Sequence, residues 1–109
     1  MTIDESDWKH LRQLHKVALE RFSKQILEEL DKIRADSSKN FHERFLASFD
    51  LINHRNKDIA MAFDDPSRSR AIAHLGVQLS LGLLTKNEFA GFTQQTQEIM
   101  KRHLGNWHA

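Results

Sequence analysis

The chain carries the stretch WKHLRQLHKVALERFSKQILEELDKI at residues 8–33. Its apolar residues recur at steps of three and four with no Gly or Pro between them, which is the spacing of an amphipathic α-helix. The residues that set this spacing are Trp8, Leu11, Ala18, Leu19, Phe22, Ile26, Leu30 and Ile33. We therefore predict one long helix that begins at Thr2 or Asp4 and ends near Arg34.

A second helix is expected after a short polar connector at residues 35–39. Ser37 or Asn40 can supply its N-cap, because both side chains accept hydrogen bonds from free backbone N–H groups. Its apolar residues form one stripe: Phe41, Phe45, Phe49, Ile52, Ile59 and Phe63. A stripe of this kind is typical of a helix face that packs against a core.

A third helix is expected to begin with Asp65 as N-cap and Pro66 at its first helical position. It extends to about Leu81 and presents two apolar faces, because Val77 and Leu81 lie nearly opposite the main apolar line. The residues of that main line are Ile72, Leu75, Leu79 and Leu83. Two faces of this helix therefore need a partner.

A fourth helix is indicated by the capping box of Thr85 and Glu88 and runs to about Leu104, where Gly105 ends it. Because all three connectors are short, helices that follow one another are expected to be antiparallel. We predict an all-α fold, a four-helix up-down-up-down bundle with a long first helix. It forms a single domain over residues 1–109.

Composition narrows the function classes. Sixteen Lys and Arg balance 15 Asp and Glu in 109 residues, so a basic surface typical of nucleic-acid binding is not expected. The longest apolar run is too short to span a membrane, and the acidic N-terminus lacks the apolar segment of a signal peptide. We expect a cytoplasmic protein that binds no nucleic acid, no membrane and no cofactor. With no cysteine, it has no thiolate ligand or nucleophile.

Five polar residues fall on the expected apolar stripes: His15, Glu29, Asn56, Arg68 and His103. In the up-down topology all of them except Glu29 come to the same end of the bundle. Two imidazoles, an amide and a guanidinium there could hold an anion or exchange protons near neutral pH. The alternative is that each is an ordinary residue at the edge of its stripe, satisfied by a backbone carbonyl. We assign no metal ligand and no catalytic residue.

Two local patterns resemble known helical families. His54, followed by Lys57 three residues later, is similar to the motif of histidine phosphotransfer domains, although Asp58 stands where that family has Gly. Arg68 and His74 fit the loose Arg-to-His spacing of HEPN ribonucleases. The first resemblance implies a phosphoryl-accepting imidazole, and the second implies RNA cleavage.

Apolar residues away from the main stripes favour an interaction protein. They are Leu14, Val17, Leu27, Val77, Leu81 and Trp107. Since one bundle has one interior, some of these must face a partner, and we take Leu14, Val77, Leu81 and Trp107 as the candidate interface. We expect a helical interaction or regulatory module that self-associates, with a homodimer as the simplest form. The alternative is a ligand-binding or catalytic bundle that uses the four polar residues.

Overall fold

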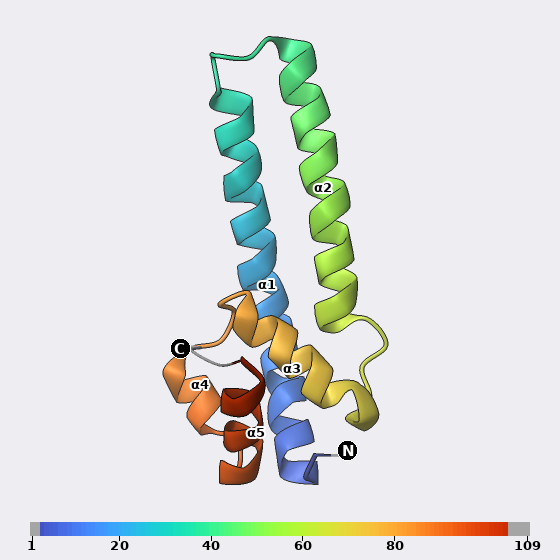
Figure 1. Cartoon of the computed structure of the whole chain (residues 1–109), viewed down its shortest axis with the longest axis vertical. Coiled ribbons are helices and arrows are strands. Elements are labelled where there is room, and N and C mark those ends of the chain that lie inside the picture. Colours follow the sequence, from blue (N-terminus) through green and yellow to red (C-terminus); the bar gives the residue numbers. More distant parts are fainter. Residues whose placement is uncertain (1–2, 105–109) are drawn as a thin grey trace.

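The computed structural model describes residues 3–104, and every regular element in this range is a helix (Figure 1). In chain order the elements are α1 (Glu5–Ala35), α2 (Phe41–Phe63), a 3₁₀ turn (Arg68–Arg70), α3 (Ala71–Ser80), α4 (Lys86–Ala90) and α5 (Gln94–Leu104). The prediction of an all-α fold with a long first helix is confirmed. At 31 residues, α1 is about 46 Å long, close to the longest dimension of the molecule, which is 51 Å.

The long helices α1 and α2 form an antiparallel hairpin (Figure 1). The connector between them ends in a capping box in which the Asn40 side chain accepts a 2.8 Å hydrogen bond from the backbone N–H of Glu43. The Glu43 carboxylate in turn accepts a 2.9 Å bond from the Asn40 N–H. Asn40, rather than Ser37, therefore begins the second helix.

The third helix starts later than its sequence indicates. Asp65 has φ 51°, in the left-handed region that Asp tolerates better than most residues, so it forms part of a turn rather than an N-cap. The chain then makes a 3₁₀ turn, and α3 begins only at Ala71. The expected start at Pro66 is wrong, and α3 has ten residues and a length of about 15 Å.

The prediction of a single fourth helix is also wrong. Thr85 and Glu88 form the expected capping box, but α4 ends after one turn at Ala90 and a separate helix, α5, begins at Gln94. The carboxylate of Asp7, from the first turn of α1, accepts hydrogen bonds from the backbone N–H and the hydroxyl of Thr93, at 2.8 and 2.7 Å. Asp7 therefore binds the chain where the sequence pattern suggested continuous helix.

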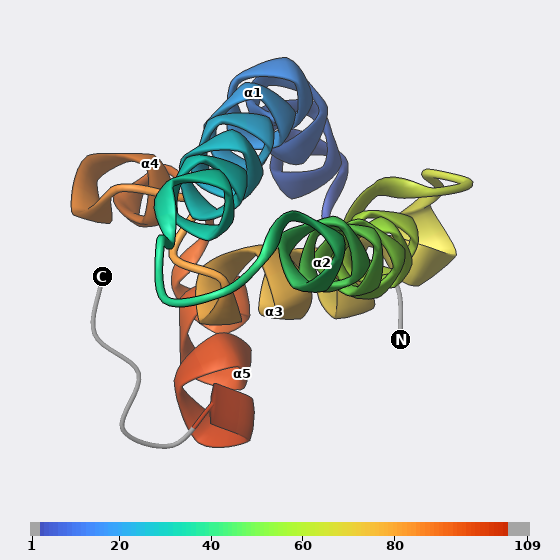
Figure 2. The ribbon, with the colours of Figure 1, turned by 90° about the horizontal axis from the view of Figure 1, so that it is seen from above.

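The helices after α2 pack around one end of the hairpin, formed by the N-terminal half of α1 and the C-terminal end of α2. We call this end the foot of the molecule. Figure 1 shows α3 crossing below the end of α2, with α4 and α5 beside the N-terminal half of α1. Figure 2, which looks along the hairpin, shows α5 lying across the direction of α1 and α2. The up-down-up-down arrangement of four columns is not confirmed.

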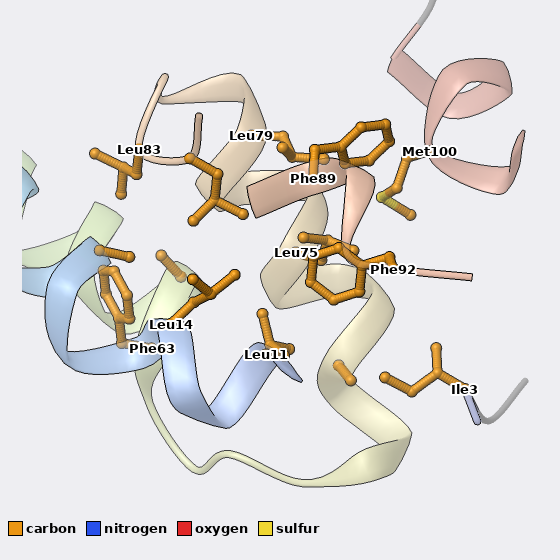
Figure 3. Close-up of a cluster of buried hydrophobic side chains, with 14 of the residues drawn as sticks. Ile3, Leu11, Leu14, Phe63, Leu75, Leu79, Leu83, Phe89, Phe92 and Met100 are labelled. Atoms are coloured by element: carbon orange, nitrogen blue, oxygen red, sulfur yellow. The ribbon is translucent and has the colours of Figure 1, made fainter. Parts of the chain in front are cut away.

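One hydrophobic core lies in this foot, and all of these helices contribute to it (Figure 3). Its buried apolar members are Ile3, Leu11, Leu14, Ala18, Phe22, Ala62, Phe63, Ala71, Leu75, Leu79, Leu83, Leu84, Phe89, Phe92, Ile99 and Met100. Residues 23–61 contribute no buried side chain. The outer part of the hairpin therefore extends beyond the core as a pair of helices, because α3 is too short to cover a 23-residue α2.

Candidate functional site

An exposed apolar stripe runs along the outer half of α2. Phe41 is 83% exposed, Phe45 62%, Phe49 57% and Ile52 50%. All four lie on the helix face that, about two and three turns beyond Ile52, carries the partly buried Ile59 and the core residue Phe63. The prediction that the whole stripe faces the core is wrong for these four. The length of α3 decides where burial stops.

Leu46, also exposed, lies beside this stripe on α2. We call Phe41, Phe45, Leu46, Phe49 and Ile52 the hairpin stripe. Three phenylalanines with more than half of their surface exposed on one helix face are unusual, because Phe is among the residues most often buried. A contiguous apolar patch of this kind typically marks a contact surface.

Polar contacts join the outer parts of α1 and α2, where no side chain is fully buried. The Arg55 guanidinium lies between two carboxylates, 3.0 Å from Glu29 of α1 and 3.0 Å from Asp58 of its own helix. These hydrogen bonds, chiefly the one to Glu29, raise the pKa of Arg55. Nearer the connector, Arg44 donates a 2.8 Å bond to the backbone carbonyl of Arg34. These contacts leave the hairpin stripe facing solvent.

The four polar residues predicted to converge make their contacts separately. The His15 ring packs edge-on against Phe63, with centroids 5.2 Å apart, and Asn56 is exposed on α2. Arg68 donates a 2.7 Å bond to the Ile3 carbonyl, and His103 Nδ1 donates a 2.8 Å bond to the Ile99 carbonyl. Within residues 3–104 no hydrogen bond or ring contact joins any two of the four.

A different histidine, His74 of α3, lies close to His15. It is buried, and desolvation lowers the pKa of His74, an effect to which the positive charges of Arg70 and His15 add. A hydrogen bond with the backbone of Asp64 acts in the opposite direction. His74 is not among the four residues that the sequence pattern brings together, although it immediately precedes the core residue Leu75 and lies one helical turn before buried Gln78.

The residues proposed as an interface have different environments. The prediction that Leu14 belongs to an interface is wrong. Leu14 is buried in the core, because the foot of the molecule covers that side of α1. Val77 and Leu81 are half-buried and pack against the core, and Val77 lines a shallow apolar groove of about 320 Å³ between α3 and α5. Trp107 lies outside the described residues. Val17 and Leu27 are exposed on α1.

The two motif resemblances fall on unrelated parts of the fold. His54 is exposed on α2 and its Nδ1 donates a 3.1 Å bond to the Asp50 carbonyl, while Asp58 is engaged by Arg55. Arg68 and His74 are both held by backbone groups, of Ile3 and Asp64 respectively. The geometry adds no reacting partner to either imidazole among the residues described.

Within residues 3–104, no three His, Cys, Asp or Glu side chains are placed to share a metal ion. In the same range no helix combines the length and the apolar character that crossing a membrane requires. No family model, curated protein or solved structure matches this chain.

Proposed function

We propose that this chain is a self-associating helical module in which the hairpin stripe packs against the hairpin of a second copy. The observation that carries the proposal is the exposure of Phe41, Phe45, Phe49 and Ile52 along one helix face. Two α1–α2 hairpins brought together in this way would form a four-helix bundle between subunits. Such a bundle would supply the outer hairpin with the apolar interior that a single chain lacks.

The area of the stripe is sufficient for this role. Its three phenylalanines, with Leu46 and Ile52, expose roughly 500 Å² of apolar side chain, given the size of an aromatic side chain. Two copies would together bury roughly 1,000 Å² of this surface, about the minimum for a specific interface, before any polar rim is counted.

The charge of the hairpin favours a second copy of this chain as the partner that covers the hairpin stripe. Residues 23–61 contain seven Lys or Arg and seven Asp or Glu, so this segment is formally neutral. A neutral surface neither repels an identical surface nor attracts a strongly charged partner such as nucleic acid or an anionic membrane. Asn56, one turn beyond Ile52 on the same face, would contribute a polar position that fixes the register of the pair.

The test is the mass of the protein in solution, measured by light scattering during size exclusion at about 100 μM, within the range where weak homodimers form. We expect twice the chain mass of 12.7 kDa. The variant F45E/F49E should be a monomer with unchanged helix content, because both side chains are exposed and the core is in the foot.

Met61→Glu is the matched control. Met61 is 60% exposed, nearly the same as Phe45, but it lies on the opposite side of α2. This variant should remain a dimer. A monomeric wild-type protein, or a dimer that survives F45E/F49E, would show that the hairpin stripe is not a self-association surface.

A further inference from the structure

A cleft lies at the foot of the molecule, where α1 passes the turn that follows α2. It has a volume of about 450 Å³ and is lined by Trp8, Arg12, His15, Lys16 and Pro66. This volume is within the range of small-molecule sites, and Trp8 and Pro66 supply flat apolar walls. The cleft is built from the foot of the fold, whereas the hairpin stripe lies on the outer half of α2.

A second, much smaller space adjoins the same residues. It measures about 10 Å³, and Trp8, Arg12, His15 and Pro66 line it as they line the cleft. Leu11, His74 and Gln78 complete its lining. A space of this size accommodates a single hydroxyl, amino group or water.

Gln78, one of the residues that line this small space, carries an unpaired acceptor. Gln78 is 1% exposed, and its Nε2 donates a 3.1 Å bond to the Ala62 carbonyl. Its Oε1 is buried, and no described residue donates a hydrogen bond to it. Exchanging the two amide atoms would place Oε1 against the Ala62 carbonyl oxygen, so the orientation is fixed. A buried acceptor without a donor is costly and indicates that another group supplies one.

The cleft is positively charged. Arg12 and Lys16 lie one helical turn apart on α1, and the Arg12 guanidinium lies 5.7 Å from the centre of the Trp8 ring. No Asp or Glu of the described chain lines either space. Two exposed cations beside an indole and a proline ring suit a planar ligand that carries a negative charge.

We propose that this cleft binds a small aromatic anion that also carries a hydrogen-bond donor. The donor enters the small space and bonds Gln78 Oε1, the ring lies against Trp8 and Pro66, and the anionic group pairs with Arg12 and Lys16. Each part of the ligand corresponds to one observation. The donor matches the unpaired buried acceptor, the ring matches the flat walls, and the anionic group matches the two cations. The site does not depend on self-association, so the two proposals can fail separately.

The probe is 4-hydroxybenzoate, which has the ring, the anion and the donor. We expect saturable shifts of the Trp8 indole N–H and of the Gln78 side-chain amide in ¹⁵N-labelled full-length protein, with a Kd of about 1 mM. Benzoate, which lacks the hydroxyl, should bind at least about tenfold more weakly. Neutral 4-hydroxybenzamide, which lacks the charge, should do the same.

Two variants separate the contributions of charge and donor. R12A/K16A should lose most of the binding, whereas K24A/K32A, which removes two exposed charges from the same helix outside the cleft, should bind normally. Gln78→Met keeps the side-chain volume and removes the acceptor, so it should abolish the preference for 4-hydroxybenzoate over benzoate. R12A/K16A changes exposed residues only and remains informative if Gln78→Met does not fold.

Three results would overturn the proposal. The first is an unchanged spectrum at probe concentrations above about 10 mM, ten times the expected Kd. The second is equal binding to R12A/K16A and to K24A/K32A. The third is a crystal structure grown with the probe in which a water alone bonds Gln78 Oε1 and the cleft holds no probe.

Discussion

The Asp7 carboxylate accepts a 2.6 Å hydrogen bond from the hydroxyl of Thr96, 89 positions later in the chain. The same carboxylate binds the backbone N–H and hydroxyl of Thr93, so it satisfies the first turn of α5 from a different helix. Asp7 is 1% exposed, and the partial positive charge of the α5 N-terminus lies beside it. This contact joins the two ends of the described chain.

Replacing Asp7 by Asn should lower the free energy of unfolding by about 1–3 kcal/mol, because the amide keeps one acceptor oxygen but puts a donor in place of the oxygen that accepts from two threonine hydroxyls. Urea denaturation followed by circular dichroism measures this. Asp4→Asn is the control, since Asp4 is exposed and makes no side-chain cap bond; it should change stability by less than about 0.5 kcal/mol. Equal effects of the two variants would contradict the role assigned to Asp7.

Gly91 should not tolerate alanine. A Cβ atom at Gly91 would lie 2.5 Å from Nε2 of His10, and His10 is held by a 2.7 Å hydrogen bond to the Glu88 carbonyl and by the Phe92 ring. Gly91→Ala should therefore destabilise by about 1–2 kcal/mol.

Gly76→Ala is the matched comparison, because its Cβ would meet nothing within 4 Å in the interior of α3. It should stabilise the protein by about 0.5–1 kcal/mol through helix propensity. Thermal unfolding should show a lower melting temperature for Gly91→Ala and a higher one for Gly76→Ala. Adding His10→Ala should relieve most of the cost of Gly91→Ala, and a cost that persists in that double variant would show that the His10 contact is not its cause.

The ion pair of Arg21 and Glu88 predicts acid sensitivity. The two guanidinium nitrogens bond the two carboxylate oxygens at 2.6 and 3.0 Å, and this pairing is the main reason that the pKa of Glu88 falls from 4.5 to about 2. Since the folded-state pKa lies below the unfolded value, the stabilisation is present above pH 4.5. It is lost as the pH falls from 4.5 toward 2.

Glu88→Gln should lower the free energy of unfolding at pH 7 by about 1–2 kcal/mol, a range reduced for solvent screening because Arg21 is partly exposed. The variant should also show a smaller fall in stability between pH 4.5 and 2 than the wild type. Denaturation curves at several pH values test this. Glu5→Gln, which removes an exposed pair with Lys9, should behave as wild type, and matching curves for both variants would contradict the prediction.

His74 predicts a second pH dependence at milder acidity. Burial lowers the folded-state pKa of His74 from 6.5. Just below pH 6.5, His74 therefore binds a proton in the unfolded chain more readily than in the folded chain. Stability from this group is therefore lost as the pH falls below 6.5, at no more than about 1.4 kcal/mol per pH unit, until the folded-state value is reached.

The groups around His74 all enter this balance: Arg70 and His15 oppose protonation, and Asp64 favours it. His74→Gln, which cannot be protonated, should reduce the slope of stability against pH just below 6.5. Exposed His42 provides the control, since His42→Gln should leave the slope nearly unchanged. Equal slopes for wild type and His74→Gln would exclude the proposed effect.

The helical periods and end signals could be taken from sequence because they are local. Spacing of apolar residues predicts α1 and α2 within a few positions, and the side chains of Asn40 and Thr85 cap the helices that they begin. The break before Gln94 could not be predicted, because Asp7 binds Thr93 across 86 positions of sequence.

The sequence by itself determined that the chain is helical, that its first helix is long and that Phe41 to Phe63 share one face. Only the tertiary structure decided that this face is buried at Phe63 and exposed at Phe45, that Leu14 is in the core, and that His15 lies close to His74 rather than to His103. The physical reason is that periodicity defines which face of a helix is apolar. The lengths and directions of the neighbouring helices determine how much of that face is buried.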